Sequence, residues 1–348
     1  AGVGLDGNSP ELVAAIEAAV ADGMDVINMS LGEPEIEPSR DIVVRALAGA
    51  ARAGVVPVVA AGNDFEDFGR GSVGSPGSSP DAITVGAVTT SRSGADDVVA
   101  SFSSSGPTPL SLQLKPEVSA PGAGILSAAP RNSYTTLSGT SMAAPHVAGA
   151  VALLLQRHPT WTPAQVKSAL TLTGDAAYAD ELKSKELSTV RGGGGVVNLP
   201  RADNPLVFAA PVALSFGLPG PGASVTRSVK LTDAGGGAGP WAVTVEQQTV
   251  AAGVTVSVPP EIAVPGTLAV AVTTTSAPEA EVSGFVVLTR GSDRRRIPYW
   301  FRTGAPALAG VPRKTLRQPG FYTASTKGGT NRITRYRYPE RPAGKGFA

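Results

Sequence analysis

The sequence predicts two folds in succession, an α/β part built on a parallel sheet and an antiparallel β-sandwich after it. Up to Arg191, apolar runs with helical spacing alternate with short runs typical of buried strands. After the glycine run 191–195 and the proline-containing stretch 200–211, short alternating runs are separated by Gly or Pro. A chain of 348 residues is long enough for both.

The first part of the chain alternates helix and strand patterns. The run 11–23 has apolar residues at helical spacing and ends on Gly23, a typical C-cap. The β-branched run 25–32 predicts a buried strand. The cycle then continues through a helix at 41–53 and strands at 57–61 and 82–88. In such a sheet, ligands bind at the carboxyl ends of the strands, where residues 30–32 and 62–63 are expected.

The segment SGTSMAAPHVAGA, residues 138–150, places Ser141 after a glycine and directly before an apolar helix. The unpaired N–H groups and the dipole of a helix N-terminus favour negative charge beside that hydroxyl, which suits a nucleophile and its oxyanion. The alternative is that Ser141 only caps the helix. The helix is apolar on nearly all sides, which predicts burial. Thr162 and Pro163 then open another helix through Leu170, expected to close the α/β part.

We expect three regions with boundaries at 1–203, 204–305 and 306–348. The middle region contains five alternating runs, at 224–236, 241–248, 253–260, 266–275 and 283–291, which predict the strands of a β-sandwich. The last region is rich in Lys and Arg, with tyrosines in alternating contexts, and is expected to be the truncated start of a further β-rich module. A run this basic also leaves open an acidic partner.

Composition excludes several classes of protein. The net charge of +1 gives no support for a nucleic-acid partner, and the absence of Cys excludes disulfides and thiolate metal sites. No apolar run approaches the ~20 residues of a membrane span. The chain opens on Ala1 without an initiator Met or signal peptide, from which we expect an internal cut in a longer protein.

Five segments occur together in one order: DVINMSLG, VVAAGN, SFSSSGP, KPEVSAPG and SGTSMAAPHVAGA. In this order and at these separations they resemble the subtilisin-like serine proteases, or subtilases, especially large secreted members with appended β-sandwich domains. The resemblance implies that Ser141 attacks the scissile carbonyl to form an acyl-enzyme and that Asn63 donates to the oxyanion. It also implies a fibronectin III-like sandwich, a secreted or cell-surface location and a polypeptide substrate.

The same resemblance implies a set of substrate-binding residues. Ser30, Leu31 and Gly32 match the segment that pairs with substrate backbone, and Ala60, Ala61 and Gly62 match the opposite wall of the first specificity pocket. Gly74 would form the base of that pocket and Asp64 would lie near its rim. A glycine base leaves room for large apolar side chains, and Asp64 adds tolerance for basic ones.

A serine nucleophile needs a general base, and the chain has only two histidines. His158 would lie about 25 Å along the same helix at ~1.5 Å per residue, and His146 would point roughly 140° away from Ser141, as a packing residue. Because the triad order in subtilases is Asp, His, Ser, both missing members would precede Ala1. We therefore expect this fragment alone to be inactive.

Two other classes remain as alternatives. The chain could be a non-catalytic binding or adhesion module on a subtilase-like core, although such a module has no chemical use for Ser141 and Asn63. The related serine-carboxyl peptidases would place an Asp at position 63. No cofactor is expected, and structural calcium cannot be assigned, because Asp64, Asp67, Asp96 and Asp97 are scattered in a pattern more typical of solvated loops.

Overall fold

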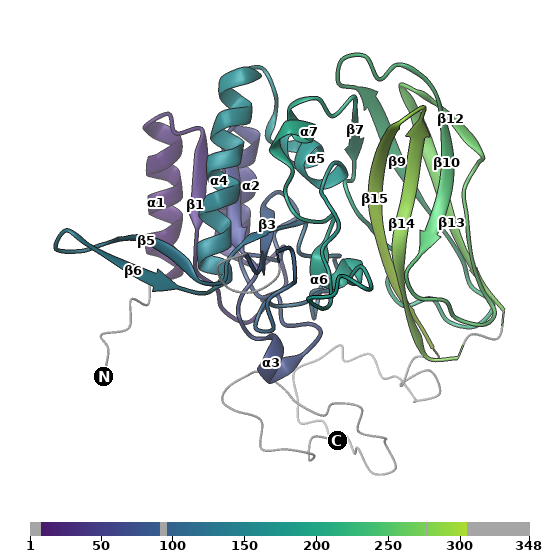
Figure 1. Cartoon of the computed structure of the whole chain (residues 1–348), viewed down its shortest axis with the longest axis horizontal. Helices are drawn as coiled ribbons and strands as arrows, with labels where there is room; N and C mark the ends of the chain where they lie inside the picture. The colour runs from purple at the N-terminus through teal and green to yellow at the C-terminus, as the bar shows by residue number, and fades with distance from the viewer. Residues whose placement is uncertain (1–7, 91–95, 276–277, 305–348) are drawn as a thin grey trace, which may run out of the picture.

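The computed structural model describes residues 8–90, 96–275 and 278–304. A parallel-sheet part, from helix α1 to helix α7, lies beside a sandwich that runs from strand β7 to strand β15 (Figure 1). The predicted fold class, α/β followed by a β-sandwich, is confirmed. The basic region 306–348 lies outside the described residues, so its predicted β-rich module stays a prediction.

Four parallel strands form the central sheet, in the order β1-β2-β3-β4. The strands are β1 (Val26–Met29), β2 (Val56–Ala60), β3 (Ile83–Val88) and β4 (Val118–Pro121). The first three were predicted within a residue or two, apart from the predicted extension of β1 to residue 32. The fourth lies in the KPEVSAPG segment and was not predicted as a strand.

Helices cover both faces of this sheet. On one face pack α1 (Ser9–Ala21) and α2 (Ile42–Arg52), and on the other α4 (Thr140–Arg157) and α5 (Pro163–Leu172). Successive side chains of β2 alternate between the layers, because a strand points them to opposite faces. Thus Val58 packs in the cluster with α4, and Val59 packs in the cluster with α1 and α2.

The ends of these helices follow their sequence signals. Asp41 caps α2 by accepting from the N–H groups of Val43 and Val44 at 2.8 and 3.2 Å. Thr162 caps α5 in a capping box with Gln165, as Thr162-Pro163 predicted. Gly23, just after α1, has a φ of +74°, the left-handed conformation expected of a residue that ends a helix.

Helix α4 is not buried on nearly all sides, and that prediction was wrong. Pro145, Gly149 and Ala152 are exposed, and the side chain of Leu153 is 51% exposed. The sheet covers only one side of the helix, since β1 is an edge strand with a single strand neighbour among the described residues. The opposite side of α4 therefore stays uncovered in the part of the chain that the structure describes.

Several short elements were not predicted. A hairpin of β5 (Ile125–Ala129) and β6 (Ser133–Leu137) joins β4 to α4 and projects from the body of the molecule (Figure 1). Every residue of β6 is exposed, including Tyr134 at 76%. Three helices of four or five residues complete the parallel-sheet part: α3 (Phe65–Phe68), α6 (Thr189–Gly192) and α7 (Leu199–Asp203).

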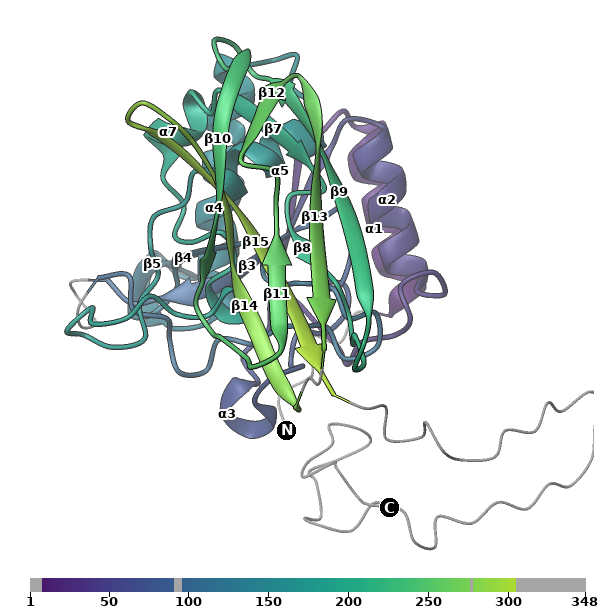
Figure 2. The same ribbon diagram turned by 90° about the vertical axis from the view of Figure 1, so that its right-hand side faces the viewer.

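Two sheets face each other in the sandwich, with strand orders β12-β10-β14-β15-β8 and β11-β13-β9-β7 (Figure 2). The strands are β7 (Val207–Ala210), β8 (Leu214–Ser215), β9 (Ser224–Asp233), β10 (Gly239–Gln247), β11 (Val254–Ser257), β12 (Glu261–Val264), β13 (Gly266–Thr274), β14 (Ala280–Arg290) and β15 (Asp293–Thr303). The pairings are antiparallel except for β15 with β8. Trp241, Tyr299 and Phe301 are buried between the sheets.

Candidate active site

Ser141 is the second residue of α4, whose N-cap is Gly139. Its hydroxyl lies 3.4 Å from the carbonyl oxygen of Ser30 and donates to it, and the Ser30 hydroxyl donates to the Ser141 carbonyl at 2.9 Å. A capping hydroxyl would instead accept from a backbone N–H of the first helical turn. The alternative that Ser141 only caps the helix is therefore wrong. The start of α4 and the segment after β1 are joined at this serine.

Asn63 is fixed by the residue that precedes Ser141. Its Oδ1 accepts from the Thr140 backbone N–H at 2.8 Å and from the Thr140 hydroxyl at 3.0 Å. Its Nδ2 lies close to Gly139, where an added Cβ would stand 3.4 Å from it. Because Oδ1 holds both donors, the amide N–H groups point away from them, and they make no hydrogen bond to the described residues. Asn63 thus presents a free donor near Ser141.

The loop that carries Asn63 has little freedom. The Thr140 hydroxyl accepts from the Gly62 N–H at 3.1 Å, and the Ser104 hydroxyl accepts from the Asp64 N–H at 3.1 Å. Gly62 has a φ of +104°, and a Cβ there would lie 2.8 Å from Ser104 Oγ. Only glycine combines that backbone conformation with that approach.

One cavity of about 270 Å³ brings together all ten residues that the sequence predicted for the site. They are Ser30, Leu31, Gly32, Ala60, Ala61, Gly62, Asn63, Asp64, Gly74 and Ser141. Three further lining residues, Glu33, Ser75 and Thr140, were not predicted. The position of Thr140 between Gly139 and Ser141 was the one sequence signal available for it. Glu33 and Ser75 had no such signal.

Ser75 anchors the wall of this cavity to the rest of the sheet. Its backbone exchanges hydrogen bonds with Glu33 in both directions, at 2.8 and 2.9 Å. Its hydroxyl donates to the buried carboxylate of Asp41, the cap of α2. Across the cavity, a Cβ on Gly32 would stand 3.4 Å from the Ser75 carbonyl oxygen. The walls are thus mainly backbone held at a fixed separation, an arrangement that can pair with an extended peptide and accept one side chain.

Both histidines lie within the described residues and make their hydrogen bonds away from Ser141. His146 is exposed, and its Nδ1 lies 2.8 Å from the Met142 carbonyl oxygen. The prediction that His146 is a packing residue was therefore wrong, because it lies on the uncovered side of α4. His158 stacks on Trp161 and has Nε2 2.8 Å from an Asp203 carboxylate oxygen. Neither ring is hydrogen-bonded to the serine.

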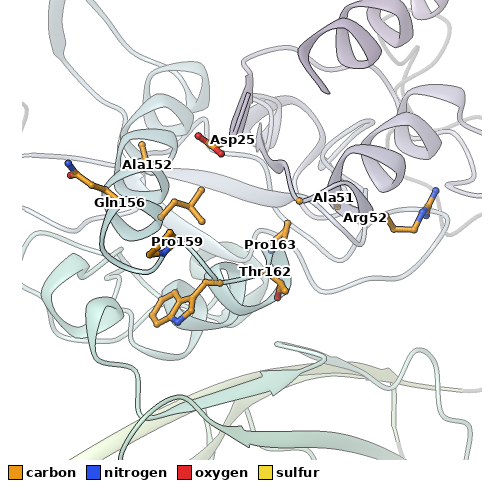
Figure 3. Close-up of a pocket in the computed structure, with 11 residues that line it drawn as sticks. Asp25, Ala51, Arg52, Ala152, Gln156, Pro159, Thr162 and Pro163 are labelled. Atoms are coloured by element: carbon orange, nitrogen blue, oxygen red, sulfur yellow. The ribbon is translucent and has the colours of Figure 1, made fainter. Parts of the chain in front are cut away.

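A second cavity, of about 530 Å³, lies at the other end of α4 (Figure 3). Asp25, Arg52, Gln156 and Pro163 are among the residues that line it, and none of the predicted site residues does. It lies beside the residues that precede β1 and β2, at the amino ends of these strands. Parallel α/β sheets bind ligands at the carboxyl ends, where the cavity beside Ser141 lies.

Among the described residues, no group of three or more His, Asp or Glu side chains is placed to hold a metal ion. No helix in the described part of the chain combines the length and apolar character needed to cross a membrane.

A serine at the start of a helix and an asparagine amide held beside it are groups that serine hydrolases use in catalysis. A model of the subtilase family matches residues 2–194, more than half of the sequence. The chain belongs to the subtilase family.

Its relatives include bacterial subtilisins. Subtilisin E of Bacillus subtilis (strain 168) is 43% identical over 162 residues, which are 47% of this chain and 39% of that protein. Subtilisin DY of Bacillus licheniformis is 40% identical over 176 residues, 49% of this chain and 59% of that protein. A plant relative, subtilisin-like protease SBT3.7 of Arabidopsis thaliana, is 42% identical over 121 residues, 31% and 16% of the two chains. The chain thus spans roughly 40–60% of these two bacterial relatives.

Proposed function

We propose that this chain is the serine-bearing part of a subtilisin-like endopeptidase that hydrolyses polypeptides through an acyl-enzyme on Ser141. The observation that carries the proposal is the free amide donor of Asn63 beside the start of α4. As the scissile carbonyl becomes tetrahedral, this amide and the Ser141 N–H would stabilise its oxyanion. In subtilisin itself, the side-chain amide donor of the oxyanion hole is worth roughly 3–4 kcal/mol.

The substrate would lie along the cavity beside Ser141. Ser30, Leu31 and Gly32 would pair with its backbone, and Ala60, Ala61 and Gly62 would form the opposite wall. Gly74 at the base leaves space for a large apolar side chain, and Asp64 at the rim would accept a basic one. The division at 203 and 305, the fibronectin III-like nature of the sandwich and a secreted or cell-surface location belong to the same proposal.

The general base and its acidic partner would come from polypeptide outside these 348 residues. Both histidines are engaged elsewhere, so no imidazole of this chain is available to take the Ser141 proton. The open edge of β1 and the uncovered side of α4, with Gly149 and the half-exposed Leu153, support a covering polypeptide at this face. An exposed apolar face of this kind is typical of an interaction surface.

The test is the reaction of Ser141 with a fluorophosphonate probe. The chain alone should label slowly, because no base activates the hydroxyl. Addition of a polypeptide that carries the subtilase Asp and His segments should raise the labelling rate by at least a hundredfold. The Ser141→Ala variant should label in neither case. Rapid stoichiometric labelling of the chain alone would contradict the external base.

The non-catalytic binding module makes a different prediction in the same assay. It expects no increase in labelling when the base-bearing polypeptide is added, although that polypeptide binds. Binding without acceleration would therefore favour the module over the peptidase.

A further inference from the structure

A larger cavity, of about 1220 Å³, lies between the parallel-sheet part and the sandwich. One wall comes from the parallel-sheet part. It includes Pro34 and Glu35, which follow residues 30–33 in the chain, and the loop that carries Leu110. The other wall comes from the sandwich, including Leu218, Trp300 and Arg302. We call this cavity the interpart cleft. None of the ten predicted site residues lines it.

The interpart cleft and the proposed substrate groove are lined by neighbouring stretches of the chain. Ser30, Leu31 and Gly32 line the cavity beside Ser141, and Pro34 and Glu35, which follow in the chain, line the cleft. The distance from Ser30 to Pro34 is at most about 14 Å for an extended chain. A polypeptide paired with residues 30–32 therefore needs only a few further residues to reach the cleft.

The direction of such a polypeptide follows from the position of Ser141. Its hydroxyl lies 3.4 Å from the Ser30 carbonyl oxygen, so the attacked carbonyl would lie at the Ser30 end of the segment. The attacked carbonyl belongs to the substrate residue whose side chain occupies the first specificity pocket. The substrate residues before it, paired with residues 30–32, would then run away from Ser141, toward Gly32 and Pro34. The residues that reach the cleft are thus those on the amino side of the scissile bond.

The chemistry of the cleft fits apolar side chains. Leu110 and Leu218 line it from opposite walls and are 59% and 56% exposed. Prolines at positions 34, 107 and 109 add further apolar surface. The exposed cations of the cleft are already paired, Arg70 with Glu281 and Arg302 with Glu279. Two exposed leucines that face one hollow are a binding feature, since isolated exposed leucines are ordinary but a shared apolar patch is not.

The walls of the cleft are held together before any ligand binds. The Glu35 carboxylate accepts from the Leu110 N–H and from the Ser111 hydroxyl, which ties the substrate segment to the loop. The Ser215 hydroxyl donates to the Leu112 carbonyl oxygen, which ties that loop to β8 of the sandwich. Such preorganisation lowers the entropy cost of binding an extended peptide.

We propose that the interpart cleft is an extended subsite that binds apolar side chains of the polypeptide substrate roughly four to eight residues on the amino side of the scissile bond. The sandwich would thereby contribute to substrate selection. This inference rests on the proposed function, because it takes its direction from Ser141 as the nucleophile.

The test uses three peptides and isothermal titration calorimetry on the full chain. The short probe is an N-acetylated four-residue peptide that ends in a phenylalanine carboxylate. The apolar probe carries six further residues before it, alternating Leu and Gly, and the polar probe carries six residues alternating Ser and Gly. The apolar probe should bind at least tenfold more tightly than the other two, because it alone buries leucines in the cleft.

The variant Leu110→Asp/Leu218→Asp should remove this tenfold advantage and leave the affinity for the short probe within twofold. The matched control is Leu182→Asp/Val250→Asp, which changes two residues that are 90% and 80% exposed and do not line the cleft. It should leave all three affinities unchanged. An apolar advantage that is absent, or that survives in the cleft variant, overturns the proposal.

Two further measurements separate this inference from other outcomes. Gly74→Val should weaken the binding of all three probes equally. If the affinity for the short probe does not change in this variant, the result counts against the proposed function and not against the cleft. Sedimentation velocity of the chain should show a monomer. A dimer that the cleft variant dissociates would assign the cleft to a second copy and overturn the proposal.

Discussion

At the scale of single residues, Thr140 connects the two groups on which the proposed chemistry depends. Its backbone and hydroxyl both donate to Asn63 Oδ1, and the hydroxyl also accepts from the Gly62 N–H. Thr140 is fully buried, so its hydroxyl depends on these protein partners for its hydrogen bonds. Thr140 thereby fixes which end of the Asn63 amide is free.

Thr140→Val keeps the shape of the side chain but removes the hydroxyl. Asn63 then loses one donor and the Gly62 N–H loses its acceptor, which should lower the free energy of unfolding by about 1–3 kcal/mol. Urea denaturation measures the loss. Thr140→Ser keeps the hydroxyl and serves as the control, with a smaller effect from the lost methyl group. Equal losses in the two variants would show that packing and not hydrogen bonding holds Asn63.

The residues that could be predicted at this scale are those in sequence motifs. Ser141 and Asn63 lie in two of the five segments that resemble the subtilases by their order in the chain. The structure brings both residues to one cavity. Ser75 could not be predicted, because its place in the wall depends on a hydrogen bond to Asp41, a residue 34 positions away in the chain. Such pairings depend on tertiary structure and leave no local pattern.

At the scale of elements, a buried charge cluster fixes α5 to the sheet. Glu117, just before β4, lies 2.6 Å from Lys115 and 2.7 Å from Lys167 of α5, and also accepts from the Thr84 N–H. Burial alone would raise the pKa of Glu117, but the two ammonium groups outweigh it and hold this pKa below its usual value. Burial lowers the pKa of Lys115 from 10.5 to about 7, against the attraction of Glu117.

This cluster predicts stability that rises with pH. Between pH 7 and about 10.5, Lys115 is largely neutral in the folded chain but still protonated in the unfolded chain. The unfolded state then binds more protons, so the free energy of unfolding increases with pH through this window. Urea denaturation from pH 6 to pH 10 measures the slope. The slope should be smaller in Lys115→Met and unchanged in Lys230→Met, which removes an exposed lysine of β9.

An equal slope in both variants would contradict the assignment to Lys115. Lys167 and Asp81 also act on Lys115 electrostatically. The free energy of unfolding of each variant is therefore compared with that of the wild-type chain at each pH.

The elements themselves were predictable where their pattern is local. Strands β1, β2 and β3 are short apolar runs that follow helices, and α5 carries its cap and first-turn proline in the sequence. Strand β15 escaped prediction because Arg294, Arg295 and Arg296 interrupt its apolar alternation. The exposure of α4 could not be predicted from its sequence. The apolar composition of a helix shows how much surface the helix could bury, but the position of the sheet determines how much it buries.

At the scale of the whole molecule, one arginine of the sandwich reaches into the parallel-sheet part. Arg296 of β15 is 6% exposed and donates to the carbonyl oxygens of Gly174 and Gly194 at 3.2 and 3.1 Å. It also pairs with Glu186 at 2.5 Å and lies over the Phe285 ring at 4.2 Å. The interpart cleft exists only while the two parts keep this relative position.

We expect the two parts to unfold in one cooperative calorimetric transition, and Arg296→Leu to lower the free energy of unfolding by about 2–4 kcal/mol. The loss comes from two carbonyl groups and a carboxylate that lose a buried donor.

Arg294→Leu is the matched control, two residues away in the same strand, where the side chain is 46% exposed and pairs with Glu246. An exposed pair is worth about 0–1 kcal/mol, so this variant should change little. If both variants lose the same free energy, Arg296 does not couple the parts. The walls of the cleft are then held by other contacts between the parts, such as the Arg70–Glu281 pair and the bond from the Thr189 hydroxyl to the Tyr299 carbonyl oxygen.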